Sequence, residues 1–195
     1  MATRDDLAWF KTTFQAPIRT ALAGTPFSLD LITAIAAQET GEVWGPLHAS
    51  LPLDQLLAIC VGDTLDADRG RVAFPKTMAD LIAVPNGQAM FDLAHQALVD
   101  MAAHVPGYTA VSKRASKFCH AFGIFQFDIQ FFKDDPDYFL QKRWQQFDAS
   151  LGKCLQELHA ASQRIGLDNQ PALSDLDQVH VPSPTTPARS SPRKA

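Results

Sequence analysis

One carboxylate ends an otherwise apolar stretch of the chain, from Ile32 to Thr40, and its surroundings suggest acid catalysis. Counting back from Glu39, Ile35 lies one helical turn away and Ile32 two turns away, so the three share one face of an α-helix. A carboxylate on a buried face loses hydration, which raises its pKa and keeps it protonated near neutral pH. The general acid that cleaves a glycosidic bond needs this property. The pattern also fits a solvated glutamate at a helix end, because Glu is seldom fully buried.

A second segment, from Phe122 to Asp128, brings a glycine, a glutamine and a carboxylate close together. Gln126 can both donate and accept hydrogen bonds, so it suits an N-acetyl or hydroxyl group of a sugar. The same side chain could instead tie down the buried backbone of its own turn. The weak alternation from Phe118 to Asp128 predicts a short strand or a turn under a cleft.

The two segments together, Ala-x-x-Glu-Thr followed by Gly-Ile-Phe-Gln-Phe-Asp, resemble the lysozyme-like glycan hydrolases, above all the goose-type lysozymes and the lytic transglycosylases. The resemblance implies that Glu39 is the catalytic acid at the end of a buried helix, and that Thr40 fixes the local turn. It also implies that residues 123–126 form the next wall of the cleft. Asp128 stands where a carboxylate handles the attacking water in the goose-type enzymes.

Two departures from that superfamily refine the prediction. The motifs lie unusually far apart, so we expect an insertion at about 41–117 that reshapes the cleft. No Tyr-Asn-Ala-Gly segment follows Asp128, which favours a hydrolase over a transglycosylase. The polar loop 62–70 carries Asp63, Asp66 and Asp68, any of which could replace Asp128 as the second acid. The loop could equally be a solvated turn.

Aromatic residues near the motifs are candidates for sugar binding, because an indole or phenyl face can pack against a pyranose ring. Trp44 could line such a subsite or plug the core beside the helix end. Tyr138 and Phe139 begin a later helix and are predicted to lie near the substrate groove. The predicted substrate-binding residues are Thr40, Trp44, Gln126, Phe127 and Tyr138.

Apolar periodicity predicts a chain built mainly from helices. The expected helical ranges are 5–22, 28–40, 51–61, 76–84, 87–104 and 134–164. Pro17 should kink or shorten the first of them, and Gly41 should stop the second. The acids and the proline at 134–136 should begin the last, and residues 105–120 are expected to be irregular.

The composition predicts one globular domain at 1–168, followed by a Pro/Ser-rich tail at 169–195 that should be flexible. A net charge of −4 argues against a general nucleic-acid surface. No apolar run approaches the roughly 20 residues that span a bilayer. The start of the chain lacks the features of a secretory signal, so we expect synthesis in the cytoplasm and a non-classical route, by export or lysis, to a cell wall in the periplasm or outside the cell.

Neither a metal nor a cofactor is expected. Cys60, Cys119 and Cys154 show no metal-binding spacing and should be free thiols, with a Cys119–Cys154 bridge as the alternative. His95 and His104 have no carboxylate or cysteine partner at ligand spacing.

These observations predict a mainly α, lysozyme-like α+β fold with a buried helix that ends in Glu39 and at most a small β-hairpin. The predicted function is cleavage of the β-1,4 glycan of peptidoglycan, as in a muramidase. A lytic transglycosylase, a chitin or chitosan hydrolase and a non-catalytic glycan-binding protein of lysozyme fold remain alternatives. The expected partner is the polysaccharide, and the sequence identifies no secretion or immunity partner.

Overall fold

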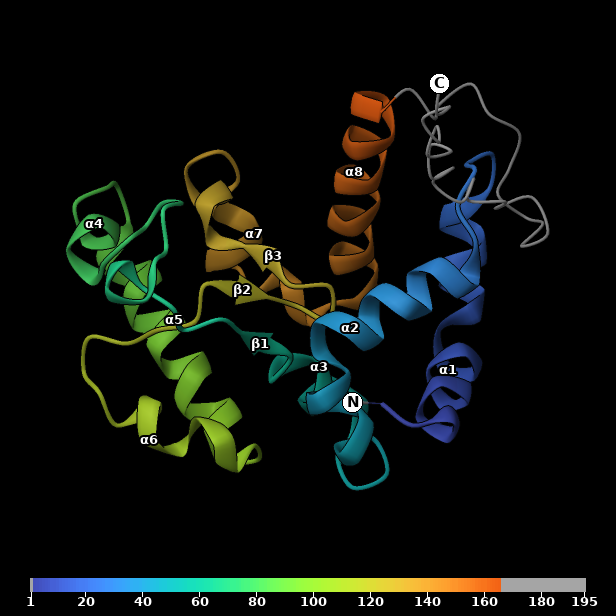
Figure 1. Cartoon of the computed structure of the whole chain (residues 1–195), viewed down its shortest axis with the longest axis horizontal. Helices are drawn as coiled ribbons and strands as arrows, with labels where there is room; N and C mark the ends of the chain where they lie inside the picture. The colour runs from blue at the N-terminus through green and yellow to red at the C-terminus, as the bar shows by residue number, and fades with distance from the viewer. Residues whose placement is uncertain (1, 166–195) are drawn as a thin grey trace, which may run out of the picture.

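The computed structural model describes residues 2–165, which fold mainly into helices around one small sheet (Figure 1). The tail predicted at 169–195 lies outside the described residues. The α-helices are α1 (Arg4–Leu22), α2 (Leu29–Leu47), α3 (Leu53–Ala58), α4 (Met78–Ile82), α5 (Gly87–Ala102), α6 (Thr109–Ser112), α7 (Pro136–Leu140) and α8 (Phe147–Ile165). Short 3-10 segments are η1 (Ala67–Arg69), η2 (Pro106–Tyr108), η3 (Ile129–Lys133) and η4 (Arg143–Gln145). The prediction of a mainly helical chain is confirmed.

The sheet consists of three short antiparallel strands, β1 (Val61–Gly62), β2 (Ala121–Phe122) and β3 (Phe127–Asp128), in the order β1-β2-β3. Strands β2 and β3 form the hairpin that the sequence predicts, and β1 adds a third strand from within the predicted insertion. Val61, Phe122 and Phe127 are in register and buried. Gly62, Ala121 and Asp128 occupy the alternate positions, so Asp128 lies on the other face of the sheet.

The prediction that Gly41 stops the second helix is wrong, because α2 continues to Leu47. A Cβ atom at Gly41 would lie 3.2 Å from Cβ of Ala2, and one at Gly45 would lie 3.2 Å from a carboxylate oxygen of Asp6. Both glycines therefore let α2 pack closely against the start of α1 instead of ending the helix. Glu39 consequently lies within α2 and not at its end.

All but one of the remaining helical predictions agree with the structure in place but differ in extent. Helix α1 matches the predicted 5–22 closely and is not shortened by Pro17, which lies inside it. The predicted irregular segment 105–120 contains η2 and α6. The long helix predicted at 134–164 is wrong, because the chain breaks between α7 and α8, where Lys142 has a positive φ of 54°. The break buries Phe139 and Trp144 in the aromatic core.

The sheet lies between two groups of helices (Figure 1). Helices α1, α2 and α8 lie on one side of it in this view, and α4, α5 and α6 on the other. Within residues 2–165, no helix is both long and apolar enough to cross a membrane.

Candidate functional site

The two motifs of the sequence are in direct contact in the fold. The hydroxyl of Thr40, buried on α2, donates a hydrogen bond to the carbonyl oxygen of Ile124 over 2.7 Å. Ile124 lies in the β2–β3 turn, where Gly123 has a φ of 82° and the amide of Gln126 donates to the Gly123 carbonyl. This contact fixes the position of Glu39, one residue before Thr40, relative to the hairpin.

Glu39 is exposed, so the expectation of a fully buried carboxylate is wrong. Its pKa is nevertheless raised by partial desolvation, in the direction that acid catalysis requires. Glu39 also influences a residue of α8. Burial, followed by the charge of Glu39, raises the pKa of the Cys154 thiol to about 12. Glu39 therefore lies near enough to Cys154 on α8 to influence its thiol, and it remains exposed.

A groove of about 380 Å³ lies between α8 and the β3–η3 segment. Its apolar lining includes Ile35, one turn before Glu39 on α2, together with Phe125 and Leu158. The polar lining includes Gln126, Asp128, Glu157 and Arg164. A lining that mixes apolar and polar side chains fits a ligand whose rings have apolar faces and hydroxyl edges, as sugars do.

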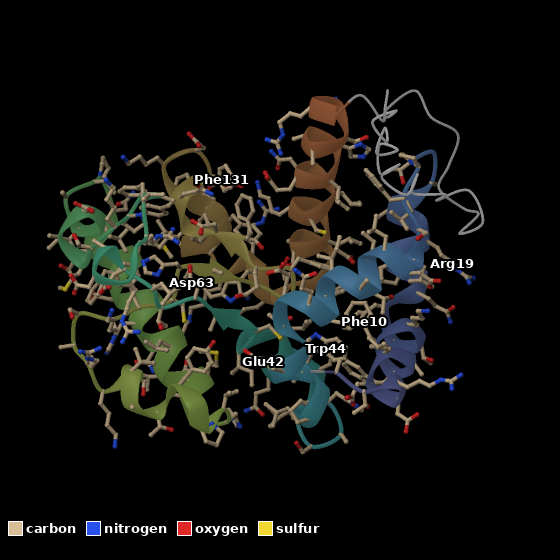
Figure 2. The ribbon with its side chains drawn as sticks, in the orientation of Figure 1. Phe10, Arg19, Glu42, Trp44, Asp63 and Phe131 are labelled. Atoms are coloured by element: carbon tan, nitrogen blue, oxygen red, sulfur yellow. The ribbon has the colours of Figure 1, made fainter. Side chains whose placement is uncertain are left out.

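Phe131 supplies the aromatic surface of this groove. Its half-buried ring stacks on Phe127, with a centroid distance of 4.8 Å and an interplanar angle of 11°. Figure 2 shows Phe131 on the segment that faces α8. Phe127, which the sequence predicts as a binding residue, also lines the groove but is only 7% exposed.

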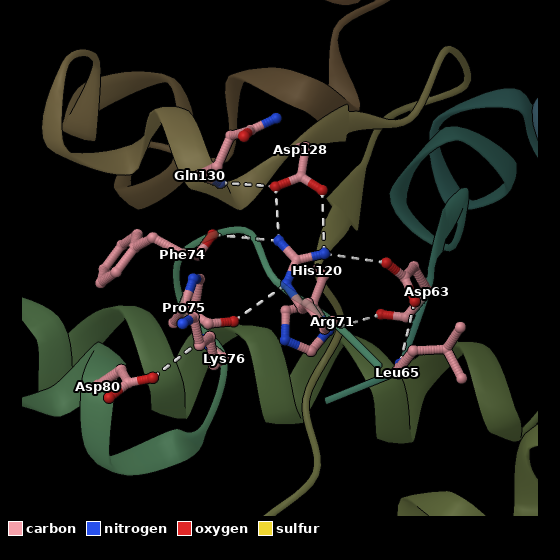
Figure 3. Close-up of polar contacts among 10 residues, drawn as sticks. All are labelled: Asp63, Leu65, Arg71, Phe74, Pro75, Lys76, Asp80, His120, Asp128 and Gln130. Carbon is pink, nitrogen blue, oxygen red and sulfur yellow. Dashed lines mark hydrogen bonds and ion pairs between the residues drawn. The ribbon is translucent and has the colours of Figure 1, made fainter. Parts of the chain in front are cut away.

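Asp128 is held by Arg71 in a two-point ion pair (Figure 3). Oδ1 accepts from Nη2 at 2.7 Å and Oδ2 accepts from Nη1 at 3.1 Å. Oδ1 also accepts from the amide of Gln130 at 2.7 Å. A carboxylate offers about four acceptor positions, so the contacts within residues 2–165 leave one on Oδ2 for water or ligand.

The carboxylates of loop 62–70 have different environments. Asp63 accepts a hydrogen bond from Arg71 at 3.1 Å and so joins the Asp128 cluster. Asp66 forms an ion pair with Lys117, and this pairing lowers the pKa of its carboxyl. Asp68 is exposed on η1 and makes no ion pair within the described part of the chain. Asp63 is therefore the loop carboxylate closest to the site.

Gln126 hydrogen-bonds to backbone carbonyls of its own turn and of a neighbouring segment, which is one of the two roles that the sequence left open. Its Nε2 donates to the carbonyl of Gly123 at 2.9 Å and, more weakly, to that of Cys60 at 3.4 Å. A Cβ atom on Gly62 would lie 2.5 Å from Oε1 of Gln126 and 3.9 Å from the hydroxyl of Tyr108. Burial, followed by the charge of Glu42, raises the pKa of Tyr108. Gln126 also lines the groove, so both of its predicted roles remain.

Two predicted binding residues belong to the core, and their assignment to the site is wrong. Trp44 is fully buried between α1 and α2, where its indole N–H donates to the Ala36 carbonyl at 3.1 Å (Figure 2). Tyr138 is 1% exposed and packs edge-on against Phe127 and Phe139. Thr40 is also buried and acts through its hydrogen bond to the hairpin rather than through ligand contact.

Arg71, His120, Tyr108, Phe131 and Glu157 are the residues near the site that sequence reasoning missed. None of them lies in a motif, and most come from segments predicted to be irregular or from the far end of the chain. The cysteines at 60, 119 and 154 are free, as predicted, and all three are buried. Within residues 2–165, no group of three or more His, Cys, Asp or Glu side chains could hold a metal ion.

Comparison with known proteins identifies no relative. No protein-family model, curated protein or solved structure matches the chain. The functional assignment therefore rests on the residues and geometry described above.

Proposed function

We propose that this protein cleaves the β-1,4 glycan strands of peptidoglycan and that Glu39 is the general acid. The observation that carries the proposal is the raised pKa of an exposed glutamate on α2, one helical turn after Ile35, which lines the groove. A raised pKa keeps the carboxyl protonated at higher pH, and exposure lets it reach the leaving oxygen of a glycosidic bond.

The residues around Glu39 have distinct roles in this proposal. The bond from Thr40 to Ile124 holds the acid in place beside the hairpin. Phe131 offers a ring face to a sugar, and Gln126 and Arg164 offer hydrogen-bonding groups at the rim. Asp128, held by Arg71, orients the attacking water through the acceptor position left on Oδ2.

The exchange of Glu39 for glutamine tests the proposal directly. Glu39→Gln keeps the shape of the side chain and removes the transferable proton, so lysis of purified sacculi should fall by about 10²- to 10⁴-fold. The matched control is Glu42→Gln, which changes the next exposed glutamate of α2. Loss of turbidity measures activity, and circular dichroism checks that both variants fold.

Retention of wild-type lysis by Glu39→Gln would contradict the assigned role. If the wild type binds sacculi without lysing them, the protein is a glycan-binding protein instead. Preferential cleavage of chitin or chitosan oligomers would reassign the substrate while retaining the acid.

A lytic transglycosylase is the second candidate, and the ion pair of Asp128 with Arg71 favours it. Both oxygens of Asp128 already accept hydrogen bonds from Arg71, so fewer acceptor positions remain to take a proton from water. In a transglycosylase the sugar closes on itself and no activated water is needed. The two reactions leave different chain ends, which can be distinguished by product analysis.

A further inference from the structure

Arg71 is the most completely bonded polar side chain near the groove. Its guanidinium carries five N–H donors, and all five have acceptors (Figure 3). Nε donates to the Pro75 carbonyl at 3.0 Å, and Nη2 to the Phe74 carbonyl at 3.1 Å. The other bonds go to the carboxylates of Asp63 and Asp128. The side chain of Arg71 is only 7% exposed.

These bonds join three parts of the chain that are distant in sequence. Asp63 follows β1, Phe74 and Pro75 belong to the loop before α4, and Asp128 ends β3. Asp128 in turn caps η3 by accepting from the amide of Gln130. The 3-10 segment η3 carries Phe131, whose ring forms the aromatic wall of the groove. A continuous set of contacts thus runs from Arg71 to the groove.

We infer that Arg71 is a positioning residue for the substrate groove, acting through Asp128 on η3 and Phe131. The inference rests on the proposed function and adds a specific determinant of substrate binding. Planar guanidinium donors match a carboxylate at two points, which fixes its orientation as well as its charge. Without Arg71, Asp63 and Asp128 would repel each other, and the start of η3 would lose its fixed anchor.

Kinetics on solubilised glycan strands test this inference. Arg71→Gln should raise KM by about tenfold or more, because η3 and Phe131 lose their anchor, and should lower kcat by a smaller factor, because Asp128 is loosened while the acid Glu39 is untouched. Lys117→Met is the matched control, because it breaks the ion pair with Asp66, in the same loop, without touching Asp128. We expect the control to lower Tm and leave KM unchanged.

A double-mutant cycle tests the route through Asp128. If Arg71 acts through that carboxylate, Arg71→Gln should have little further effect on KM in an Asp128→Asn background. If Arg71→Gln does not fold, Arg71→Lys keeps the charge but loses the two-point geometry, and its KM should then rise several-fold.

The outcomes separate the two proposals. Additive effects in the cycle, or a KM for the Arg71 variants equal to that of the Lys117→Met control, would overturn the inference and leave the proposed function intact. A wild-type protein that neither binds nor cleaves wall glycan would overturn the proposed function, and the inference with it.

Discussion

Glu39 combines an exposed side chain with a pKa that desolvation raises. The two properties are compatible because partial desolvation is enough to raise the pKa, and Ile35 lies one turn before Glu39 on the same face of α2. A completely buried carboxyl could not reach a glycosidic oxygen. The exposure that contradicts the sequence prediction is therefore what an acid catalyst requires.

The apolar side chain of Ile35, one turn before Glu39, gives a prediction about the pH dependence of activity. A general acid is active while protonated, so activity should fall as the pH rises through the raised pKa of Glu39. Ile35→Ser should admit water near Glu39 and so lower the pKa of Glu39. The alkaline limb of the pH–activity profile should then move to lower pH. Rate measurements from pH 4 to 9, in about half-unit steps, would detect the shift. Val99→Ser, an exposed apolar position on α5, should leave the limb in place.

His120 gives a second prediction at this scale. It is 1% exposed, and burial, followed by the charge of Arg71, lowers its pKa. The unfolded chain therefore binds the proton more readily, so stability should fall as the pH drops below about 6.5 toward the lowered pKa, by at most about 1.4 kcal/mol per pH unit. Urea unfolding at several pH values measures this slope. His120→Gln should flatten it, and an unchanged slope would assign the effect to other groups.

At the scale of elements, close backbone packing sets the relation of α4 to α5. Asn86 adopts a left-handed conformation with a φ of 60°, and Gly87 follows it as the first residue of α5. A Cβ atom on Gly87 would lie 1.9 Å from the carbonyl oxygen of Leu81. This junction orients α5, whose Ala94 carbonyl accepts a hydrogen bond from the amide of Cys119, just before β2.

Gly87→Ala should accordingly destabilise the protein by about 3 kcal/mol or more, because the clash is with backbone that cannot rotate away. Gly152→Ala is the contrasting change, since that glycine is exposed within α8 and has open space around it. It should stabilise the protein by about 0.5–1 kcal/mol through helix propensity. Chemical denaturation of both variants tests the pair, and similar effects on stability would contradict this account.

At the scale of the whole molecule, the fold separates the proposed acid from the groups that hold the opposite wall. Glu39 lies on α2, beside α8, whereas Asp128 and Phe131 belong to the hairpin and η3. Arg71, from loop 63–77, holds that wall in place through its two hydrogen bonds to Asp128 (Figure 3). The predicted insertion thus supplies part of the site.

The arrangement predicts the type of product. If Asp128 orients water through its remaining acceptor position, digestion of sacculi should release muropeptides with reducing ends, as mass spectrometry would show. Anhydro ends would instead establish the transglycosylase and rule out the role of Asp128 in hydrolysis. Undigested sacculi incubated without protein provide the baseline for both kinds of end.

Features that depend on local spacing could be predicted from the amino-acid sequence. The apolar residues of 5–22 and 87–104 recur with helical periodicity, and α1 and α5 form there. Weak alternation before Asp128 predicted a short strand or a turn, and strands β2 and β3 form there. The resemblance of the two motifs implied that residues 123–126 lie beside Glu39 and Thr40, and the hydrogen bond from Thr40 to Ile124 shows that the two segments are in contact. Periodicity identifies such features because it reports on neighbours within one or two turns.

Features that depend on partners far along the chain could not be predicted, and they became visible only in the folded protein. Gly41 lies within α2 because α1 packs against it, and Trp44 is buried for the same reason. The pairing of Arg71 with Asp128 joins residues from separate parts of the fold. No local pattern encodes these contacts, because the free energy of burying a side chain or pairing a charge depends on what the folded chain brings next to it.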